Sequence, residues 1–498
     1  MRCKRLLHWF WILLLVIMHN IAAVAQQPPF IPPKDQVSYV LYDLQQQKVL
    51  DGLNIDQPLQ VASLVKIITL TMAMKQLGAD FRFKTQITTN GHMEDGILKG
   101  NLILQGGFDP FLSSDDLANL LSTLNIKNVS GNFYYQSYQQ RIESINPQQP
   151  VAASYNPALD SLGIDFNRVW LQANKPQFLQ PDARYGESPE LFVITDHRQI
   201  PTPWVRVAWR NSGYHFHKFY PSQTLNRVPA VAESWNLPRS EEKLLQWLPI
   251  KQPAYHTAMV LQTLAAHQGL ILPEPQLIPS NQQSSTSDTN IIATHESISL
   301  AEIAPRILRY SNNIAVETIG FFLMSQSANL AKSGCLDRSC ISGFVTHWLA
   351  QTYPKYNWQQ AHIAQFSGLG HDNRLTTNQL IEFLDSLWQE PNVFSILQDG
   401  FITPPFLQSS YLSTHIQAKT GTLIGVSAIA GYLFLPNRNP LAFVIVINNP
   451  EMTTNLVNQT SDRSPFSTPA QREWQQQTRQ FQYKLLEFWA ETLLLKDY

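Results

Sequence analysis

Residues 63–74 read SLVKIITLTMAM, an almost wholly apolar run that continues to Leu77 and Gly78. A run this long and apolar predicts a buried helix, and Gly78 is its natural C-terminal stop because glycine readily adopts the backbone conformation that ends helices. Ser63 and Lys66 lie three positions apart. On a helix they share one face, so the amine can reach the hydroxyl.

The surroundings of Lys66 indicate unusual chemistry. Burial disfavours a charge and pushes a lysine toward its neutral form, and a neutral amine can accept a serine proton. At the start of the helix, the backbone N–H of Ser63 is free and the helix dipole favours negative charge on an attacked carbonyl oxygen. A second match, Ser240 and Lys243, encloses two glutamates and is expected to be a solvated helix start. The spacing alone therefore leaves a structural interpretation open.

A second short pattern, Ser311-x-Asn313, stands between two predicted helices. The first opens with the capping box Ser-Leu-Ala-Glu at 299–302 and reaches Tyr310, and the second covers 314–324. A tight turn between helices exposes polar side chains toward a neighbour. For the isolated tripeptide, however, the simpler interpretation is that its Ser and Asn cap the next helix.

The third pattern is Lys419, Thr420, Gly421 and Thr422, which follows a strand-like segment at 415–418. A lysine on an edge strand can direct its charge into a cleft, and a glycine lets a substrate approach the backbone. Alone, Lys-Thr-Gly is more often an ordinary strand end. A buried Ser-x-x-Lys helix, a Ser-x-Asn turn and a Lys-Thr-Gly strand, in that order, are typical of penicillin-binding proteins and class A β-lactamases.

Longer stretches of the chain resemble one family, the class C low-molecular-mass penicillin-binding proteins of the penicillin-binding protein 4 type. These stretches are 61–66, 77–80, 106–110, 309–313, 366–370 and 419–423. The resemblance implies a D-alanyl-D-alanine carboxypeptidase and endopeptidase with a large insertion between the first two motifs. The chain departs from the usual family pattern at Val61, where proline is usual, at Gln365 and Phe366, which replace Asp-Gly, and at Asn312, where aspartate is common.

The resemblance also implies the reaction steps. Ser63 attacks the carbonyl between two D-alanines and forms an acyl-enzyme, with Lys66 as general base. Ser311 passes a proton to the leaving amine with help from Lys419, and water then hydrolyses the ester. How the two lysines divide the base role stays open, and no metal or organic cofactor is implied.

The remaining site residues are expected to bind the substrate. Asn313 would hold its backbone, and Lys419, Thr420 and Thr422 would attract its terminal carboxylate beside Gly421. The backbone N–H groups of Ser63 and Thr422 would form the oxyanion hole. The expected partners are peptidoglycan stem peptides and, as covalent inhibitors, β-lactam antibiotics.

Strand patterns at both ends of the chain indicate the fold class. Residues 37–43 with 48–53, and 428–435 with 441–448, predict two hairpins, and helical patterns lie between them. We therefore expect an α+β fold of the penicillin-binding and serine β-lactamase type, an antiparallel sheet flanked by helices with a large β-rich insertion. The expected parts are a signal peptide at 1–25, a catalytic domain at 26–82 and 253–498, and the insertion at 83–252.

The N-terminus predicts export. Arg2, Lys4 and Arg5 precede an apolar run at 9–18, and Ala-Val-Ala at 23–25 fits a signal-peptidase site. The apolar run is shorter than the roughly 20 residues that a spanning helix needs. We therefore expect cleavage after Ala25 and a periplasmic protein.

Composition excludes several other classes. The chain has 498 residues, 44% of them hydrophobic, and a formal net charge of -1. It is therefore neither disordered nor a multi-span membrane protein, and nucleic-acid binding is not expected without a basic surface. The C-terminal segment at 468–495 is expected to dock on the sheet because its polar face is Gln-rich, although peripheral membrane or wall association stays open.

Two questions remain open at this level. Cys335 and Cys340 either form a local disulfide, as an exported compartment favours, or stay as free thiols, and two thiols without a nearby histidine pair argue against zinc. The alternative functions are a β-lactamase or esterase on the same scaffold, or a non-catalytic peptidoglycan-binding protein. No deacylating glutamate of the class A kind can be placed in the sequence.

Overall fold

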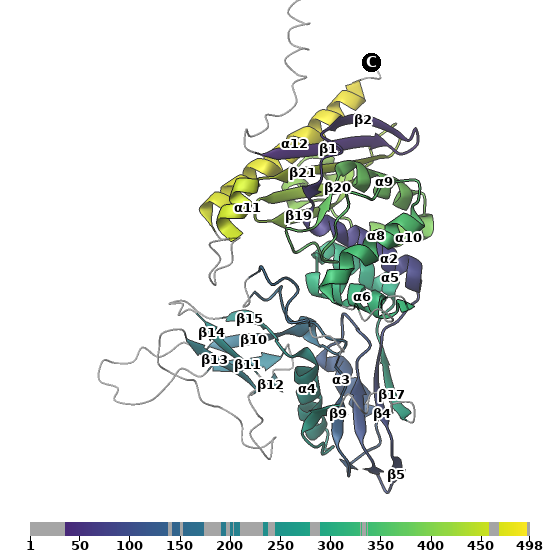
Figure 1. The fold of residues 1–498 in the computed structure, drawn as a ribbon, viewed down its shortest axis with the longest axis vertical. Helices are drawn as coiled ribbons and strands as arrows, with labels where there is room; N and C mark the ends of the chain where they lie inside the picture. Colours follow the sequence, from purple (N-terminus) through teal and green to yellow (C-terminus); the bar gives the residue numbers. More distant parts are fainter. Residues whose placement is uncertain are drawn as a thin grey trace, which may run out of the picture.

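The computed structural model describes residues 35–137, 142–149, 153–173, 191–195, 200–202, 204–209, 233–237, 245–278, 289–328, 330, 335, 337–457 and 468–495. The expected signal peptide and the second Ser-x-x-Lys match at Ser240 lie outside these residues. The described chain forms two regions, a sheet-and-helix region and a second region built mainly from the chain between β4 and β17 (Figure 1). None of the helices within the described ranges is long and apolar enough to cross a membrane.

A five-stranded antiparallel sheet joins the two ends of the chain. Its order is β19 (Ile416–Leu423), β20 (Val426–Leu433), β21 (Leu441–Asn448), β1 (Gln36–Asp43) and β2 (Lys48–Leu53). Strand β1 pairs with β21, so Val37 lies opposite Ile447. Both predicted hairpins are confirmed.

The sheet is buried on both faces, which explains why β20 and β21 are apolar throughout. Successive side chains of a strand point to opposite faces. On β20, Ala430 and Tyr432 pack in the same core as the helical layer. Ile429 and Leu433 pack on the other side, in a core with the long helix α12 (Pro469–Leu495), which crosses the sheet (Figure 1). The docked C-terminal helix is therefore confirmed.

The helical layer surrounds α2 (Val65–Leu77), which ends at Gly78 with a φ of 88°, as predicted. The expected start at Ser63 is a 3-10 turn, Ala62–Leu64, that leads directly into α2. The other helices of this layer are α5 (Leu300–Tyr310), α6 (Asn313–Ser325), α8 (Ile341–Thr352), α9 (Thr377–Trp388) and α10 (Pro391–Gln398). The capping box of α5 is confirmed, because Ser299 N donates to Glu302 Oε2 at 3.1 Å.

In its described residues, the second region contains sheets and two α-helices around its own core. One sheet has the order β16 (Pro275–Leu277), β9 (Phe133–Tyr135), β7 (Leu102–Gln105), β4 (Lys84–Thr89) and β17 (Asn290–Glu296); another has the order β12 (Ile200–Pro201), β11 (Leu191–Thr195), β10 (Arg168–Ala173) and β15 (Leu245–Pro249). Helices α3 (Ser114–Ser122) and α4 (Pro253–His267) complete it. The shorter elements of the chain are β3 (Leu59–Gln60), β5 (His92–Glu94), β6 (Ile97–Lys99), β8 (Asn128–Val129), β13 (Val205–Trp209), β14 (Glu233–Leu237), β18 (Arg374–Leu375) and α11 (Pro450–Val457).

The second region extends further along the sequence than the expected insertion at 83–252. Strand β17 pairs with β4, and Ala258, Leu261 and Ala293 pack in the core of this region. The boundary therefore lies near the end of β17 rather than after residue 252. The reason is that α4 presents an apolar face on each side, which the sequence pattern could not assign to one domain or the other.

Candidate active site

Lys66 is the centre of the site, and it is completely buried. Its Nζ donates to Ser63 Oγ at 2.9 Å, to Asn313 Oδ1 at 2.7 Å and to the carbonyl oxygen of Ser367 at 2.7 Å. These acceptors come from the turn before α2, the start of α6 and a loop that follows α8. The structure thus brings together Ser63, Lys66 and Asn313 of the predicted set.

Ser63 itself is half-buried at the beginning of the helix. Backbone N–H groups in the first turn of a helix have no partner within the helix. The residue before it, Ala62, has a φ of 48°, a left-handed conformation that is rare for a residue with a side chain. Such local strain is found most often at functional sites.

The electrostatics favour a neutral amine at Lys66. Burial lowers the pKa of Lys66 well below its usual value, the positive charge of Lys419 lowers it further, and the nearby carboxylate of Glu317 opposes both. Burial also lowers the pKa of Lys419, to about 7. A lysine with a depressed pKa can serve as a general base near neutral pH.

Two glycines allow the backbone to pack closely around Ser63. A Cβ on Gly421 would lie 2.8 Å from the carbonyl oxygen of Val61 and 3.1 Å from Ser63 N. A Cβ on Gly368, whose φ is 73°, would lie 1.9 Å from the carbonyl oxygen of Ala62. Gly421 was expected to make room for a substrate; its position shows that strand β19 needs glycine there to approach the serine turn at all.

The rest of the Lys-Thr-Gly strand lies on β19, which extends the expected strand at 415–418 through Leu423. Lys419 is buried, and its Nζ donates to the carbonyl oxygen of Thr420 at 2.7 Å. The side chains of Thr420 and Thr422 are half-buried on the same strand. Lys419 is close enough to Lys66 for its charge to act on it, so the third motif meets the first.

The Ser-x-Asn turn divides its residues between two tasks. Asn312 caps α6, because its side chain accepts from Ala315 N at 3.0 Å, and this leaves Asn313 to contact Lys66. Ser311 has a φ of 52° at the end of α5. Within the described part of the chain, its hydroxyl has no hydrogen-bond partner. The capping role that the simpler interpretation gave to the Ser and Asn of the pattern is therefore taken by Asn312, the residue between them.

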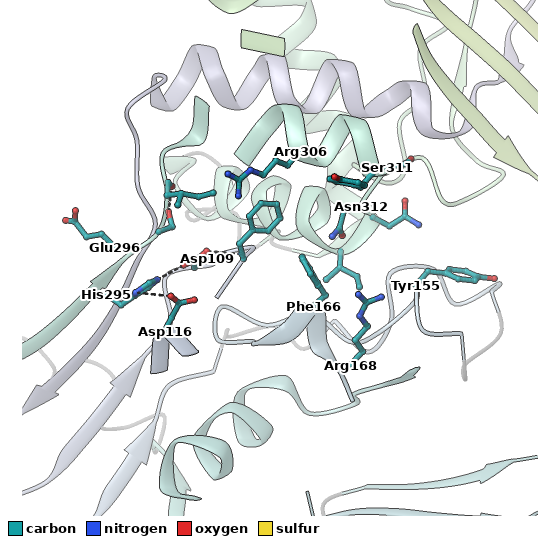
Figure 2. A pocket seen from close by; sticks show the side chains of 16 residues that line it. Asp109, Asp116, Tyr155, Phe166, Arg168, His295, Glu296, Arg306, Ser311 and Asn312 are labelled. Carbon is teal, nitrogen blue, oxygen red and sulfur yellow. Dashed lines mark hydrogen bonds and ion pairs between the residues drawn. The ribbon is translucent and has the colours of Figure 1, made fainter. Parts of the chain in front are cut away.

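Ser311 lines a cavity of about 820 Å³ between the α5–α6 turn and the second region (Figure 2). From the second region, Asp109, Phe166 and Arg168 face this cavity. His295 Nε2 lies 3.2 Å from Asp109 Oδ2 in the cavity wall. Sequence reasoning did not find His295 or Arg168, because no pattern links β17 and β10 to the catalytic motifs.

Two further buried residues support the site and were not predicted. Glu317 Oε1 accepts from Ser367 N at 2.8 Å, and the carbonyl of Ser367 is the one that Lys66 contacts. Ser367 lies in a stretch that resembles the family, and Glu317 follows Asn313 by one helical turn. Those two signals could have drawn attention to both residues.

Cys335 and Cys340 are joined in a disulfide, with their Cα atoms 6.0 Å apart. The bridge closes the short loop before α8 and therefore decides a question that the sequence left open. It also lies beside Arg338, whose charge acts on Glu317.

Comparison with known proteins identifies the family of this chain. The model of the D-Ala-D-Ala carboxypeptidase 3 (S13) family matches residues 17–465. The D-alanyl-D-alanine carboxypeptidase DacB of Haemophilus influenzae is 20% identical over 474 residues, which cover 86% of this chain and 88% of the relative. The D-alanyl-D-alanine carboxypeptidase of Actinomadura sp. strain R39 is 22% identical over 420 residues, which cover 78% of this chain and 73% of the relative.

Among solved structures, penicillin-binding protein 4 (dacB) from Haemophilus influenzae superimposes with a TM-score of 0.67 at 18% identity. The match covers 92% of this chain and 97% of that chain. At this identity the likeness concerns the fold, and it confirms the α+β class predicted above. With the family model matching most of the sequence, the chain belongs to the D-Ala-D-Ala carboxypeptidase 3 (S13) family.

Proposed function

We propose that this chain is a serine-type D-alanyl-D-alanine carboxypeptidase and DD-endopeptidase that acts on peptidoglycan stem peptides through an acyl-enzyme. One observation carries the proposal: the Nζ of a completely buried lysine, Lys66, lies 2.9 Å from Ser63 Oγ. A neutral amine at that distance can take the hydroxyl proton as the oxygen attacks. Membership of a carboxypeptidase family supports the same reaction class.

In the acylation step, Ser63 Oγ bonds to the carbonyl carbon between two D-alanines while its proton passes to Lys66. The negative charge that develops on the carbonyl oxygen would be stabilised by the backbone N–H groups of Ser63 and Thr422. Donors of this kind are worth about 100- to 1000-fold in rate. Collapse of the tetrahedral intermediate breaks the C–N bond, and the leaving amine receives a proton through Ser311 with help from Lys419.

The second step regenerates the enzyme. Water attacks the ester, the shortened peptide leaves as a carboxylic acid, and Ser63 recovers its proton. A β-lactam carbonyl would react with Ser63 in the same way and leave a slowly hydrolysed acyl-enzyme.

Lys419, Thr420 and Thr422 would hold the terminal carboxylate of the substrate at the edge strand β19. With a pKa near 7, Lys419 is only partly protonated at neutral pH. An arriving carboxylate would favour its charged form, because an opposite charge within a few ångströms stabilises an ammonium. Substrate binding is therefore expected to increase the fraction of Lys419 that carries a positive charge.

The cellular setting belongs to the same proposal. The basic start, short apolar core and Ala-Val-Ala site at the N-terminus support export to the periplasm with loss of residues 1–25. There the sheet-and-helix region would act as the catalytic domain, and the second region would be an insertion that lines the cavity beside Ser311.

The test uses two matched serine variants. Ser63→Ala is expected to abolish covalent labelling by a fluorescent penicillin and the release of D-alanine from a pentapeptide. Ser240→Ala, which removes the serine of the other Ser-x-x-Lys match, should leave both unchanged. Labelling that persists in Ser63→Ala would refute the nucleophile.

Incubation with intact peptidoglycan, followed by mass analysis of the products, separates the two peptidase activities. Wild-type protein that binds peptidoglycan but neither releases D-alanine nor cuts the cross-links between stem peptides would instead identify a non-catalytic binding protein.

A further inference from the structure

Glu317 is a buried carboxyl group that the proposed reaction does not use. It lies on α6, four residues after Asn313, and only 1% of its surface is exposed. Residues four apart share one face of a helix. Asn313 and Glu317 therefore both point toward Lys66. Asn313 accepts a hydrogen bond from Lys66 directly, whereas Glu317 is connected to it through another residue.

The intermediary is the backbone of Ser367. Its N–H donates to Glu317 Oε1 at 2.8 Å, and its carbonyl oxygen accepts from Lys66 Nζ at 2.7 Å. The neighbouring carbonyl of Phe366 accepts from Thr69 Oγ1, on α2, at 2.9 Å. Helices α6 and α2 thus hold this segment from two sides, and the position of the Ser367 carbonyl depends on both.

Glu317 is also the acidic counterpart of Lys66. Its carboxylate favours the charged form of Lys66, from α2, whereas Lys419, from β19, disfavours it. Arg338, in the turn before α8, is the other cation that acts on Glu317, and Arg338 is itself under the influence of Glu143 and Asp337. Burial raises the pKa of Glu317 above its usual value, and the hydrogen bond from Ser367 and the charges of Lys66 and Arg338 only partly oppose this rise.

We propose that Glu317 is a positioning residue for Lys66. It holds the Ser367 carbonyl against the amine, and its negative charge opposes the effect that the positive charge of Lys419 has on Lys66. This inference rests on the proposed function, in which Lys66 accepts the proton of Ser63.

The decisive variant is Glu317→Gln, which keeps an oxygen acceptor for Ser367 N and removes the charge. The measurement is the second-order rate constant for acylation by a fluorescent penicillin, as a function of pH. Without the negative charge the ammonium form of Lys66 is less stable, so the amine becomes neutral at lower pH. The midpoint of the acid limb should therefore move by about one unit to lower pH, because a neighbouring opposite charge shifts a pKa by that order.

Glu317→Asp separates positioning from charge. It keeps the charge but withdraws the carboxylate by one methylene from Ser367 N, so the plateau rate should fall about tenfold, the effect of losing a hydrogen bond to a charged group. The midpoint should stay in place. Glu382→Gln on α9 is the control, since it neutralises a partly buried carboxyl group elsewhere in the helical layer, whose neighbours are Asp56 and Lys355. Glu382→Gln should change neither the midpoint of the acid limb nor the plateau rate of acylation.

The outcomes distinguish this inference from the proposed function. If wild-type protein is not acylated at all, the proposed function fails. If wild type is acylated and folded Glu317→Gln has the midpoint of Glu382→Gln, the charge effect of Glu317 on Lys66 is overturned while the proposed function stands. If folded Glu317→Asp keeps the wild-type plateau rate, the positioning of the Ser367 carbonyl is overturned. If neither Glu317 variant folds, Glu317 is a structural residue, and the inference is overturned as well.

Discussion

Both regions of the molecule bury an ionisable side chain completely, but they surround it very differently. In the sheet-and-helix region, Lys66 has three polar partners from three separate segments. In the second region, His256 on α4 accepts from Trp204 Nε1 through Nδ1 at 2.9 Å, and no hydrogen-bond partner for its Nε2 is found within the described ranges.

The difference teaches that burial alone does not identify a functional group. Burial lowers the pKa of both side chains, that of His256 to about 3. Only Lys66 has a nucleophile within hydrogen-bond distance and a second lysine close enough to influence it. A perturbed pKa therefore indicates chemistry here only when polar partners converge on a reactive atom.

The sharpest test of this contrast is Lys66→Met. We expect the acylation rate by penicillin to fall roughly a thousandfold, because general-base catalysis is typically worth between 100- and 10,000-fold. Stopped-flow or gel-based labelling of the folded variant measures the change. Lys75→Met is the control on the same helix, since Lys75 contacts Glu390 at 2.8 Å near the surface. If folded Lys66→Met protein keeps more than a tenth of the wild-type acylation rate, Lys66 is not the general base and its contrast with His256 does not hold.

A smaller effect on the acylation rate is expected from a hydrogen bond that joins the two regions. Asn146, in the loop 142–149, donates from Nδ2 to the carbonyl oxygen of Leu369 at 3.3 Å, two residues beyond the Ser367 carbonyl. Asn146→Ala should slow acylation about fivefold, since a lost hydrogen bond is worth about 1 kcal/mol. Asn119→Ala, at an exposed position on α3, is the control. Equal rates in the two variants would show that the second region does not support the site through this contact.

The smallest effect on acylation is expected at His256. His256→Gln keeps an acceptor for Trp204 and should leave the acylation rate unchanged. Its effect should appear in stability against pH. Because the folded-state pKa of about 3 lies below the ordinary 6.5, unfolded wild type binds more protons between these values, and folding stability falls as the pH drops from 6.5 toward 3.

Urea unfolding at several pH values tests this prediction. Glutamine has no proton to gain, so His256→Gln should lose less stability in acid than wild type does. His267→Gln, at the exposed end of the same helix, should behave like wild type. A slower acylation in His256→Gln would mean that the second region contributes chemistry after all.

Local signals predicted many of the individual elements correctly. The apolar run from Ser63, the stop at Gly78 and the capping box at Ser299 each depend on residues within one or two helical turns. Predicting the domain boundary was harder. Helix α4 looks the same from its sequence whichever core receives it, and the structure shows that it packs beneath the sheet of β4 and β17.

The candidate site divides in the same way. The sequence by itself determined that Ser63 and Lys66 share a helix face, because three positions along a helix leave no other arrangement. Only the tertiary structure decided that Asn313 Oδ1 accepts directly from Lys66 Nζ, and that Glu317 accepts from the Ser367 backbone. Such contacts join residues up to 301 positions apart, so they depend on how the helices pack and not on any local preference of the chain.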